Sequence, residues 1–428
     1  MGKPKVNRWL AIAIISMAGG LSFELPYLKY NYQPAMEALM GLTATQCGVV
    51  MSTFGLLALV FYPPSGYVAD RFNHKKLISI SLVATGALGF VMATYPPYPV
   101  MILIQIGWAL STILFMWSAT VKAVSLLGSA KEQGAVLGFS EGMRGLGCLI
   151  AAFLTLWVFN KLGAETSPMS FKGVIITYSI LMLIFAVACW FVVPDGTHAI
   201  DQTEKIDNKI TAADILFVLK RKTTWLCSLI IFGVYVVYAC LSYTSSYLID
   251  IFGMSMVTAT AIGMVRNQVF RSISAPIAGL VTAKTSLKSP TRILLIAGII
   301  DLIAIAILIV TPPSQSLLVP MIGVVLLSAF SVYVSRGMYF ATIGEVKVPR
   351  KIQGTTIGIA SFIGFIPDAF IYIIIGNWQD TLPKPDAYRN MWMTACLGVL
   401  ITIVSCILLY REIKRVNEEE SGTERVLA

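Results

Sequence analysis

The sequence predicts an all-α membrane protein in which twelve transmembrane helices form two pseudo-symmetric halves of six helices each. Composition is the first reason: 57% of the 428 residues are hydrophobic and only 13% are charged, whereas about 25% charged residues is typical of soluble domains. Apolar segments of about 20 residues, long enough to cross a bilayer, also follow one another along the chain. Finally, short motifs recur between the two halves of the chain.

The apolar segments place the expected membrane spans to within a few residues. They are 9–30, 44–69, 76–95, 98–124, 133–160, 172–193, 224–249, 255–282, 292–311, 315–344, 354–377 and 391–410. A polar, proline-led stretch at 194–223 separates the sixth span from the seventh. We therefore expect an N-terminal six-helix bundle at 1–193, a cytoplasmic linker at 194–223 and a C-terminal six-helix bundle at 224–428 that ends in a short cytoplasmic tail.

Three motifs of the first half recur in the same order in the second half. The first copies contain Gly66, Pro96 and Gln133, and the second copies contain Gly279, Pro312 and Gln353. The offset between the copies stays close to half the chain. A repeat of this kind is typical of membrane folds built from two related bundles.

The net charge of +10 is better explained by membrane topology than by nucleic-acid binding. Lys and Arg concentrate in the loops and span ends of one side, and this excess marks the cytoplasmic side and places both termini there. We expect no nucleic-acid partner. The seven cysteines lie in apolar segments, the two histidines lie in loops, and no nucleotide-binding motif occurs. No disulfide framework, metal site, cofactor or enzymatic activity is therefore expected.

A short polar hinge joins the second and third expected spans. It reads Gly66-Tyr-Val-Ala-Asp70-Arg71-Phe-Asn-His-Lys75, and it lies at a membrane face because both flanking spans need hydrocarbon. The hinge resembles the signature G-x-L-A-D-R-x-G-R-K of the major facilitator superfamily, with valine, asparagine and histidine as departures. The resemblance implies a twelve-helix secondary transporter that works by alternating access, with Gly66, Asp70, Arg71 and Lys75 at its inner gate.

Within that superfamily, three further stretches resemble the YihN-type transporters of the bacterial inner membrane. They are Glu141-Gly-Met-Arg144-Gly, the run from Arg336 to Glu345, and Ser361-Phe-Ile-Gly364-Phe. Drug/proton antiporters carry a proline after the glycine motif of the fifth span, where this chain has Met143. The resemblance therefore implies an inner-membrane transporter and argues against a drug exporter.

Cationic side chains inside the spans indicate where an anion would bind. Ionisable groups at this depth are costly and usually face a cavity or each other. Arg271 shares a helix face with Asn267 and Gln268, so this polar stripe is an anion-binding candidate. Arg144 in the fifth span is a second candidate, and Lys122 near the inner end of the fourth span is a third.

Arg336 in the tenth span and a tyrosine stripe in the seventh complete the predicted binding set. The stripe contains Tyr235 and Tyr238 at helical spacing, and its hydroxyls can bind those of a solute. Two alternatives stay open. Aromatic faces near Arg336 can hold its guanidinium by cation–π contact in a structural role, and the tyrosine stripe can be interface packing.

Three carboxyl groups inside the spans are candidates for proton coupling: Glu141, Glu24 and Asp368. A carboxyl in a dry cavity keeps a proton near neutral pH, whereas a neighbouring cation keeps it ionised. Glu141 lies three residues before Arg144 on the same helix face, so movement of that arginine toward solute would switch the proton affinity; a plain ion pair is the alternative. Glu24 precedes Pro26, where we expect a kink. Neither Glu24 nor Asp368 has a cation within one turn, so Glu141 is preferred.

Together these features predict a secondary active transporter that moves a small anionic organic solute across the cytoplasmic membrane, coupled to protons. Arginine suits carboxylate, phosphate or sulfonate groups. The expected partners are the solute and the lipid bilayer, and the expected state is a monomer in the inner membrane. Two alternatives remain: an exporter of amphipathic compounds, and a transporter-like sensor that binds solute without moving it.

Overall fold

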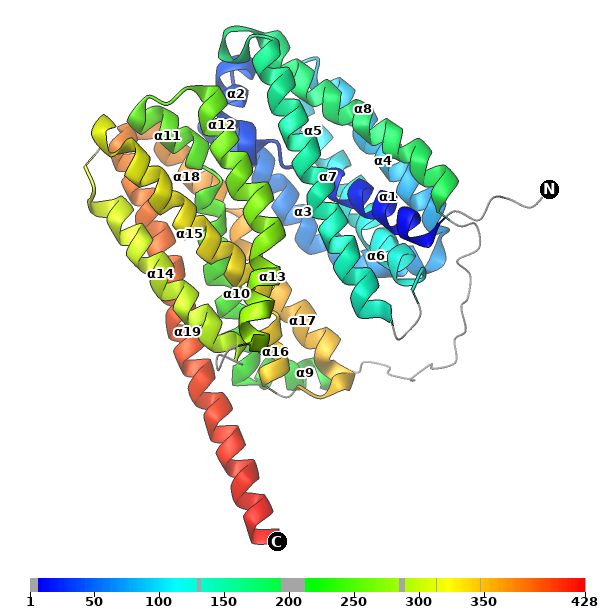
Figure 1. Cartoon of the computed structure of the whole chain (residues 1–428), viewed down its shortest axis with the longest axis vertical. Coiled ribbons are helices and arrows are strands. Elements are labelled where there is room, and N and C mark those ends of the chain that lie inside the picture. Colours follow the sequence, from blue (N-terminus) through cyan, green and yellow to red (C-terminus); the bar gives the residue numbers. More distant parts are fainter. Residues whose placement is uncertain are drawn as a thin grey trace, which may run out of the picture. The chain divides into compact units, whose positions relative to one another are not determined.

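The computed structural model describes residues 7–128, 132–193, 212–284, 289–312, 314–346 and 348–427. Within these ranges the regular elements are all helices, mostly α with short π and 3-10 segments, and no strand occurs (Figure 1). The predicted all-α fold is therefore confirmed.

Ten helices of the described ranges are long and apolar enough to cross a membrane. They coincide with the second to seventh and the ninth to twelfth predicted spans. In chain order they are α3 (Ala44–Arg71), α4 (His74–Met92), the run from α5 (Tyr98–Ala109) to α6 (Ser118–Ser125), α7 (Gln133–Lys161), α8 (Pro168–Val192), α10 (Lys222–Leu241), α14 (Pro290–Val310), α15 (Leu318–Met338) with its 3-10 lead-in, the run from α17 (Arg350–Gly364) to α18 (Ile371–Thr381), and α19 (Lys384–Leu427).

The first predicted span is not the continuous helix expected at 9–30. Helix α1 (Arg8–Leu21) ends in turns at 22–28, and α2 (Lys29–Met40) begins beyond them. Pro26 lies in these turns, and its missing N–H and fixed φ explain why the helix does not continue. The eighth predicted span is also interrupted, because the π-helix η4 (Val265–Val269) separates α12 (Met256–Met264) from α13 (Phe270–Lys284).

The polar hinge between α3 and α4 is as short as the sequence indicates, since only Phe72 and Asn73 separate the two helices. At the start of α3, Thr43 and Gln46 form a capping box in which each side chain accepts from the other residue's backbone N–H. At the start of α4, the Asn73 side chain accepts from the N–H of Lys76 at 3.2 Å. These caps set the opening residue of each helix.

Several other helix bounds differ from the predicted spans. The seventh span divides into α10 and α11 (Thr244–Phe252), and the tenth continues past a turn as α16 (Ala341–Glu345). The last helix, α19, runs well beyond the expected end at 410 because a polar, charged stretch extends it. Helix α9 (Ala212–Lys220) falls inside the expected linker. The rest of that linker, 194–211, lies outside the described residues.

The chain divides into two compact units. Unit 1 consists of Met1–Glu204, Ser242–Ser272 and Tyr372–Thr381, and unit 2 of Lys205–Leu241, Ile273–Ile371 and Leu382–Ala428. Unit 1 therefore combines the first six spans with two segments from the second half of the sequence. Within it, α2 lies beside α11 and α12 (Figure 1).

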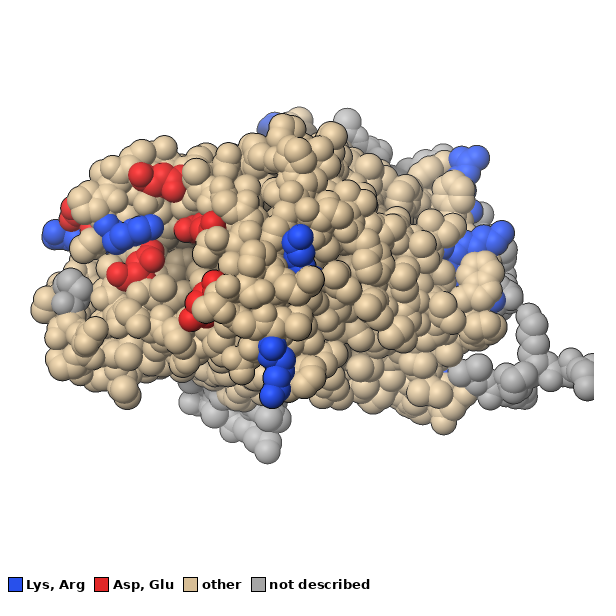
Figure 2. All heavy atoms as spheres, turned by 90° about the horizontal axis from the view of Figure 1, so that it is seen from above, with Lys and Arg blue, Asp and Glu red and all other residues tan. Residues whose placement is uncertain are grey.

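Large apolar side chains lie both in the interior and on the exposed faces of the helices. In unit 1 the core includes the fully buried Trp108, Phe171 and Tyr178, whereas Phe191 on α8 is 76% exposed. In unit 2, Val310 on α14 is 77% exposed. Figure 2 shows charged side chains gathered in a few groups, with most of the surface in view uncharged. Exposed apolar surface on this scale is suited to a lipid environment.

Candidate functional site

Three irregular helix segments of unit 1 bring polar and aromatic side chains to one place. The turns at 22–28 carry Glu24, the π-helix η1 (Leu110–Trp117) ends in Trp117, and the π-helix η4 carries Gln268. Regular helices present side chains at fixed angles, whereas a break or a π turn re-aims them. Such turns are frequent at functional sites for this reason.

Glu24 is the acceptor at the centre of this group. Its residue surface is 8% exposed. Gln268 Nε2 donates to Glu24 Oε1 at 2.9 Å, and the Tyr178 hydroxyl donates to Glu24 Oε2 at 3.3 Å. A buried carboxylate needs such donors, because removing it from water without them is costly.

Two arginines belong to the same group, and Arg271 links them. Arg271 interacts electrostatically with both Glu24 and Arg144. The Arg144 side chain is 13% exposed, and its guanidinium carbon lies 4.7 Å from the centroid of the Trp117 ring. We call Glu24, Arg144, Tyr178, Gln268 and Arg271 the Glu24 cluster. The cluster holds two guanidinium groups and one buried carboxylate, and Arg144 also pairs with the exposed carboxylate of Glu141 at 2.8 Å.

Two buried polar atoms of the Glu24 cluster have no hydrogen-bond partner within the described parts of the chain. They are Gln268 Oε1, an acceptor, and Arg144 Nε, a donor. Buried polar groups in folded proteins almost always have partners. The cluster can therefore accept a hydrogen bond from a ligand through Gln268 and donate one through Arg144.

The structure separates the predicted site residues into those at the Glu24 cluster and those elsewhere. Asn267 is 7% exposed and adjoins Gln268 in η4. Glu141 pairs with Arg144 at 2.8 Å, but its own side chain is 69% exposed. Lys122 does not join the arginines, because it forms an ion pair with Asp70.

Arg336 lies in an aromatic cage in unit 2. Its guanidinium carbon is 3.8 Å from the ring centroid of Tyr238, 5.1 Å from that of Tyr235 and 5.8 Å from that of Tyr333. Arg336 Nη2 also donates to the Tyr235 hydroxyl at 3.4 Å, whereas Nη1 is buried without a partner within the described residues. The predicted cation and the predicted tyrosine stripe therefore form one group, which we call the Arg336 cage.

Asp368, the remaining carboxyl candidate, lies in the 3-10 helix η6 (Ile366–Ala369) between α17 and α18. It is 7% exposed, and its backbone N–H donates to the carbonyl oxygen of Phe365 at 3.1 Å. Like Glu24, it is carried by a break in a membrane span rather than by a regular helix.

The hinge between α3 and α4 is a network of short contacts. Asp70 pairs with Lys122, Arg71 Nη1 donates to the Tyr67 hydroxyl at 2.7 Å, and Lys75 Nζ lies 4.9 Å from the centroid of the Trp190 ring. At Gly66, an added Cβ would meet no atom within 4 Å. The contacts of the charged hinge residues described here are all made inside unit 1.

A lysine at the end of the first predicted span is buried. Lys29 is 2% exposed. Its Nζ donates to Ser242 Oγ at 3.1 Å and lies 3.4 Å from the centroid of the Tyr243 ring and 4.9 Å from that of Tyr372. We call these four residues the Lys29 cage. The aromatic and amide residues that follow Lys29, Tyr30-Asn31-Tyr32-Gln33, were the signal that this stretch is not a solvated loop.

Further contacts close the same end of unit 1. Asp380 accepts from the N–H groups of Ala44 and Thr45 at 3.0 and 2.8 Å and so caps α3. A Cβ on Gly48 would collide with the backbone of Tyr372, and one on Gly376 would come within 2.5 Å of the Ala44 carbonyl oxygen.

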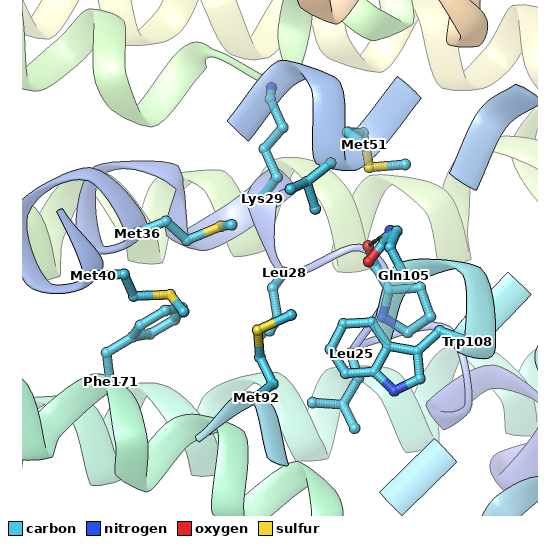
Figure 3. A pocket seen from close by; sticks show the side chains of 12 residues that line it. Leu25, Leu28, Lys29, Met36, Met40, Met51, Met92, Gln105, Trp108 and Phe171 are labelled. Atoms are coloured by element: carbon cyan, nitrogen blue, oxygen red, sulfur yellow. Dashed lines mark hydrogen bonds between the residues drawn. The ribbon is translucent and has the colours of Figure 1, made fainter. Parts of the chain in front are cut away.

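A cavity of only about 10 Å³ lies beneath the Lys29 cage, enough for one water at most. The side chains that line it include Met36, Met40, Met92, Trp108 and Phe171 (Figure 3). In Figure 3 the ammonium end of Lys29 points away from these methionines.

No cluster of metal-ligating side chains occurs in the described parts of the chain. The site consists of arginines and carboxyls carried by interrupted membrane helices, an arrangement typical of multi-pass transport proteins. The profile of the Major Facilitator Superfamily matches residues 9–371. The chain belongs to this family, as the hinge motif indicated.

Relatives and solved structures agree with this assignment. Inner membrane protein YqcE of Escherichia coli is 45% identical over 95% of this chain and 96% of its own length. Inner membrane protein YihN of the same organism is 29% identical over 96% and 98%. The hexuronate transporter of Bacillus subtilis is 23% identical over 77% and 78%.

A solved bacterial homologue of the human lysosomal transporter Spinster, inward-facing and unoccupied, superposes with a TM-score of 0.71 at 14% identity, covering 97% of this chain and 98% of its own. The predicted superfamily and its fold are confirmed.

Proposed function

We propose that this secondary transporter moves a small anionic organic solute across the cytoplasmic membrane by alternating access, coupled to protons. The observation that carries the proposal is the Glu24 cluster, in which two arginines and one buried carboxylate meet at interrupted membrane helices. Solute sites in secondary transporters are typically formed by discontinuous membrane helices.

The guanidinium groups and the hydrogen-bonding capacity of the Glu24 cluster support an anionic, hydroxylated solute. A guanidinium binds carboxylate, phosphate or sulfonate through paired N–H donors. The free acceptor at Gln268 Oε1 suits a hydroxyl group of the solute. The relative named as a hexuronate transporter carries, by its name, a solute of this kind.

The position of Glu24 beside Arg271 supports proton coupling. When the arginine acts on the carboxylate, the ionised form is favoured; when it turns to a bound anion, the buried carboxyl gains affinity for a proton. Uptake of anion and proton are then linked through one shared cation. Glu24 has the same relation to Arg271 that the sequence analysis assigned to Glu141 and Arg144, and it is far more buried.

We further propose that both termini are cytoplasmic, that the hinge residues Gly66, Asp70, Arg71 and Lys75 form the inner gate, and that the protein acts as a monomer. The excess of Lys and Arg at the hinge side supports the orientation. The Arg336 cage is the candidate anion site of unit 2, since its Nη1 has no partner in the described residues.

The direct test uses the purified protein in two formats. A thermal-shift screen against sugar acids, phosphates, sulfonates and alkyl carboxylates identifies the solute class, because a bound ligand stabilises the fold by mass action. Uptake of the best ligand into proteoliposomes, with and without an imposed pH gradient, then tests transport and coupling. Binding without uptake would indicate a sensor, and selective stabilisation by apolar cations would contradict the anionic class.

A further inference from the structure

An apolar groove runs between α4 and α8 on the exposed side of unit 1. Its volume is about 550 Å³, and its walls include Ile80 and Val83 of α4 and Val187 and Phe191 of α8. Ile80 is 63% exposed and Phe191 is 76% exposed. The groove belongs to the surface of the helices and includes no residue of the Glu24 cluster or the Lys29 cage.

One end of this groove is cationic. Lys75, Ser79 and Val83 follow one another at four-residue spacing, so they lie on one face of α4. Lys75 Nζ lies 4.9 Å from the centroid of the Trp190 ring, and Trp190 is itself a wall of the groove. The ammonium group is therefore held at the mouth of an apolar channel by the ring that lines it.

Beyond this cationic end the surface of the groove is apolar. Ser79 lies in its wall but is 5% exposed, and its hydroxyl oxygen is buried. Along the face of α4 the Lys75 ammonium is therefore followed by an aliphatic and aromatic wall. Lys75 and Val83 are just over two helical turns, about 12 Å, apart.

We propose that this groove binds an anionic phospholipid, with the lipid phosphate at Lys75 and an acyl chain against Ile80, Val83 and Val187. The cation and the apolar groove occur in the same order as the phosphate and the acyl chain of such a lipid. Tryptophan and lysine are the side chains that favour the boundary between hydrocarbon and water. On the orientation proposed above, the lipid belongs to the cytoplasmic leaflet.

The test compares phosphatidylglycerol with phosphatidylcholine on the full-length protein in mild detergent, with bound lipid counted by native mass spectrometry. We expect phosphatidylglycerol to bind about five-fold better than phosphatidylcholine. One lysine near an anionic lipid surface contributes about 1 kcal/mol to binding, which corresponds to this factor. Lys75→Gln should bring the two lipids close to parity. Lys76→Gln is the matched control, since it removes an adjacent cation that does not contact Trp190, and should keep the preference.

Two further measurements separate the acyl contribution from the charge. Ala84→Phe fills the groove and should weaken binding of both lipids, whereas inorganic phosphate added in excess should not displace phosphatidylglycerol. Displacement by phosphate would show a free-anion site and overturn the proposal. Equal binding of the two lipids to the parent protein, or an unchanged preference in Lys75→Gln, would overturn it as well, even if Ala84→Phe fails to fold.

Discussion

Replacing Glu24 with glutamine should uncouple solute movement from the proton and leave solute exchange intact. The glutamine carbonyl can still accept the hydrogen bond that Gln268 donates at 2.9 Å, but the side chain no longer takes up a proton. The bond from Gln268 becomes a neutral one, which lowers its worth from about 1.5–3 kcal/mol to about 1 kcal/mol. The cost of a buried charge disappears at the same time, so the fold should persist.

The size of the effect on transport follows from the coupling. One proton carried with each anion converts a pH difference of one unit into about a tenfold accumulation of solute, because one pH unit corresponds to about 1.4 kcal/mol. Glu24→Gln vesicles should show a ratio of about one under the same gradient, while exchange of labelled for unlabelled solute continues. The measurement is uptake into proteoliposomes with an imposed pH gradient, beside counterflow without one.

Glu141→Gln is the matched variant, because it removes a carboxylate three residues from Arg144 whose side chain is 69% exposed. It should keep most of the accumulation. Accumulation lost in Glu141→Gln and retained in Glu24→Gln would refute the reasoning and return the coupling role to Glu141. Accumulation retained in both would exclude both carboxyls.

Arg271→Lys and Arg336→Lys should each weaken binding of an anionic ligand by about 2 kcal/mol, roughly 30-fold, because lysine keeps the charge but loses the planar fork; calorimetry that shows parental affinity would make that arginine structural. Asp70→Asn should slow transport while ligand affinity stays within a few fold, and abolished binding would argue against a gate. Lys29→Met should loosen the end of unit 1 that Lys29 helps to close and raise the labelling rate of the buried Cys47 thiol, measured by mass spectrometry; unchanged labelling would show that the Lys29 cage does not hold this end.

Much of the fold was predictable because its signals are local. A segment of about 20 apolar residues has few places to lie other than a membrane helix, and ten of the twelve predicted spans coincide with long apolar helices. The hinge was predictable for the same reason, since its charges stand between two such segments. The break at 22–28 was only partly foreseen: Pro26 indicated a kink, but the structure shows two separate helices.

The candidate site was less predictable because its partners come from distant parts of the sequence. Glu24 and Gln268 are 244 positions apart, and no cation lies within one helical turn of Glu24 in the sequence. The local pattern therefore favoured Glu141, which has a nearby arginine but an exposed side chain. Arg336 and its tyrosines were each visible as in-span residues, but only the structure shows that they form one cage.

The burial of Lys29 could not be predicted from the distribution of charges along the chain. A lysine near a predicted span end is ordinarily assigned to water, and nothing in its neighbours' charge contradicts that. Its burial depends on Ser242, Tyr243 and Tyr372, which lie far along the chain. The aromatic and amide composition after Lys29 indicated burial without indicating the partner.

The two glycines at the closed end of unit 1 have a consequence for how the protein works. At Gly48 and Gly376, α3 and α18 meet backbone to backbone, with no side chain between them. A contact of this kind can separate and re-form without any rotamer being frozen or released, so its assembly carries little side-chain entropy. A methyl group added to either glycine would collide with the backbone of the other helix and push the two helices apart. Under the proposed alternating access, Gly376→Ala should therefore hold this end apart and enrich the conformation in which it is open, which would make that conformation accessible to direct structural study.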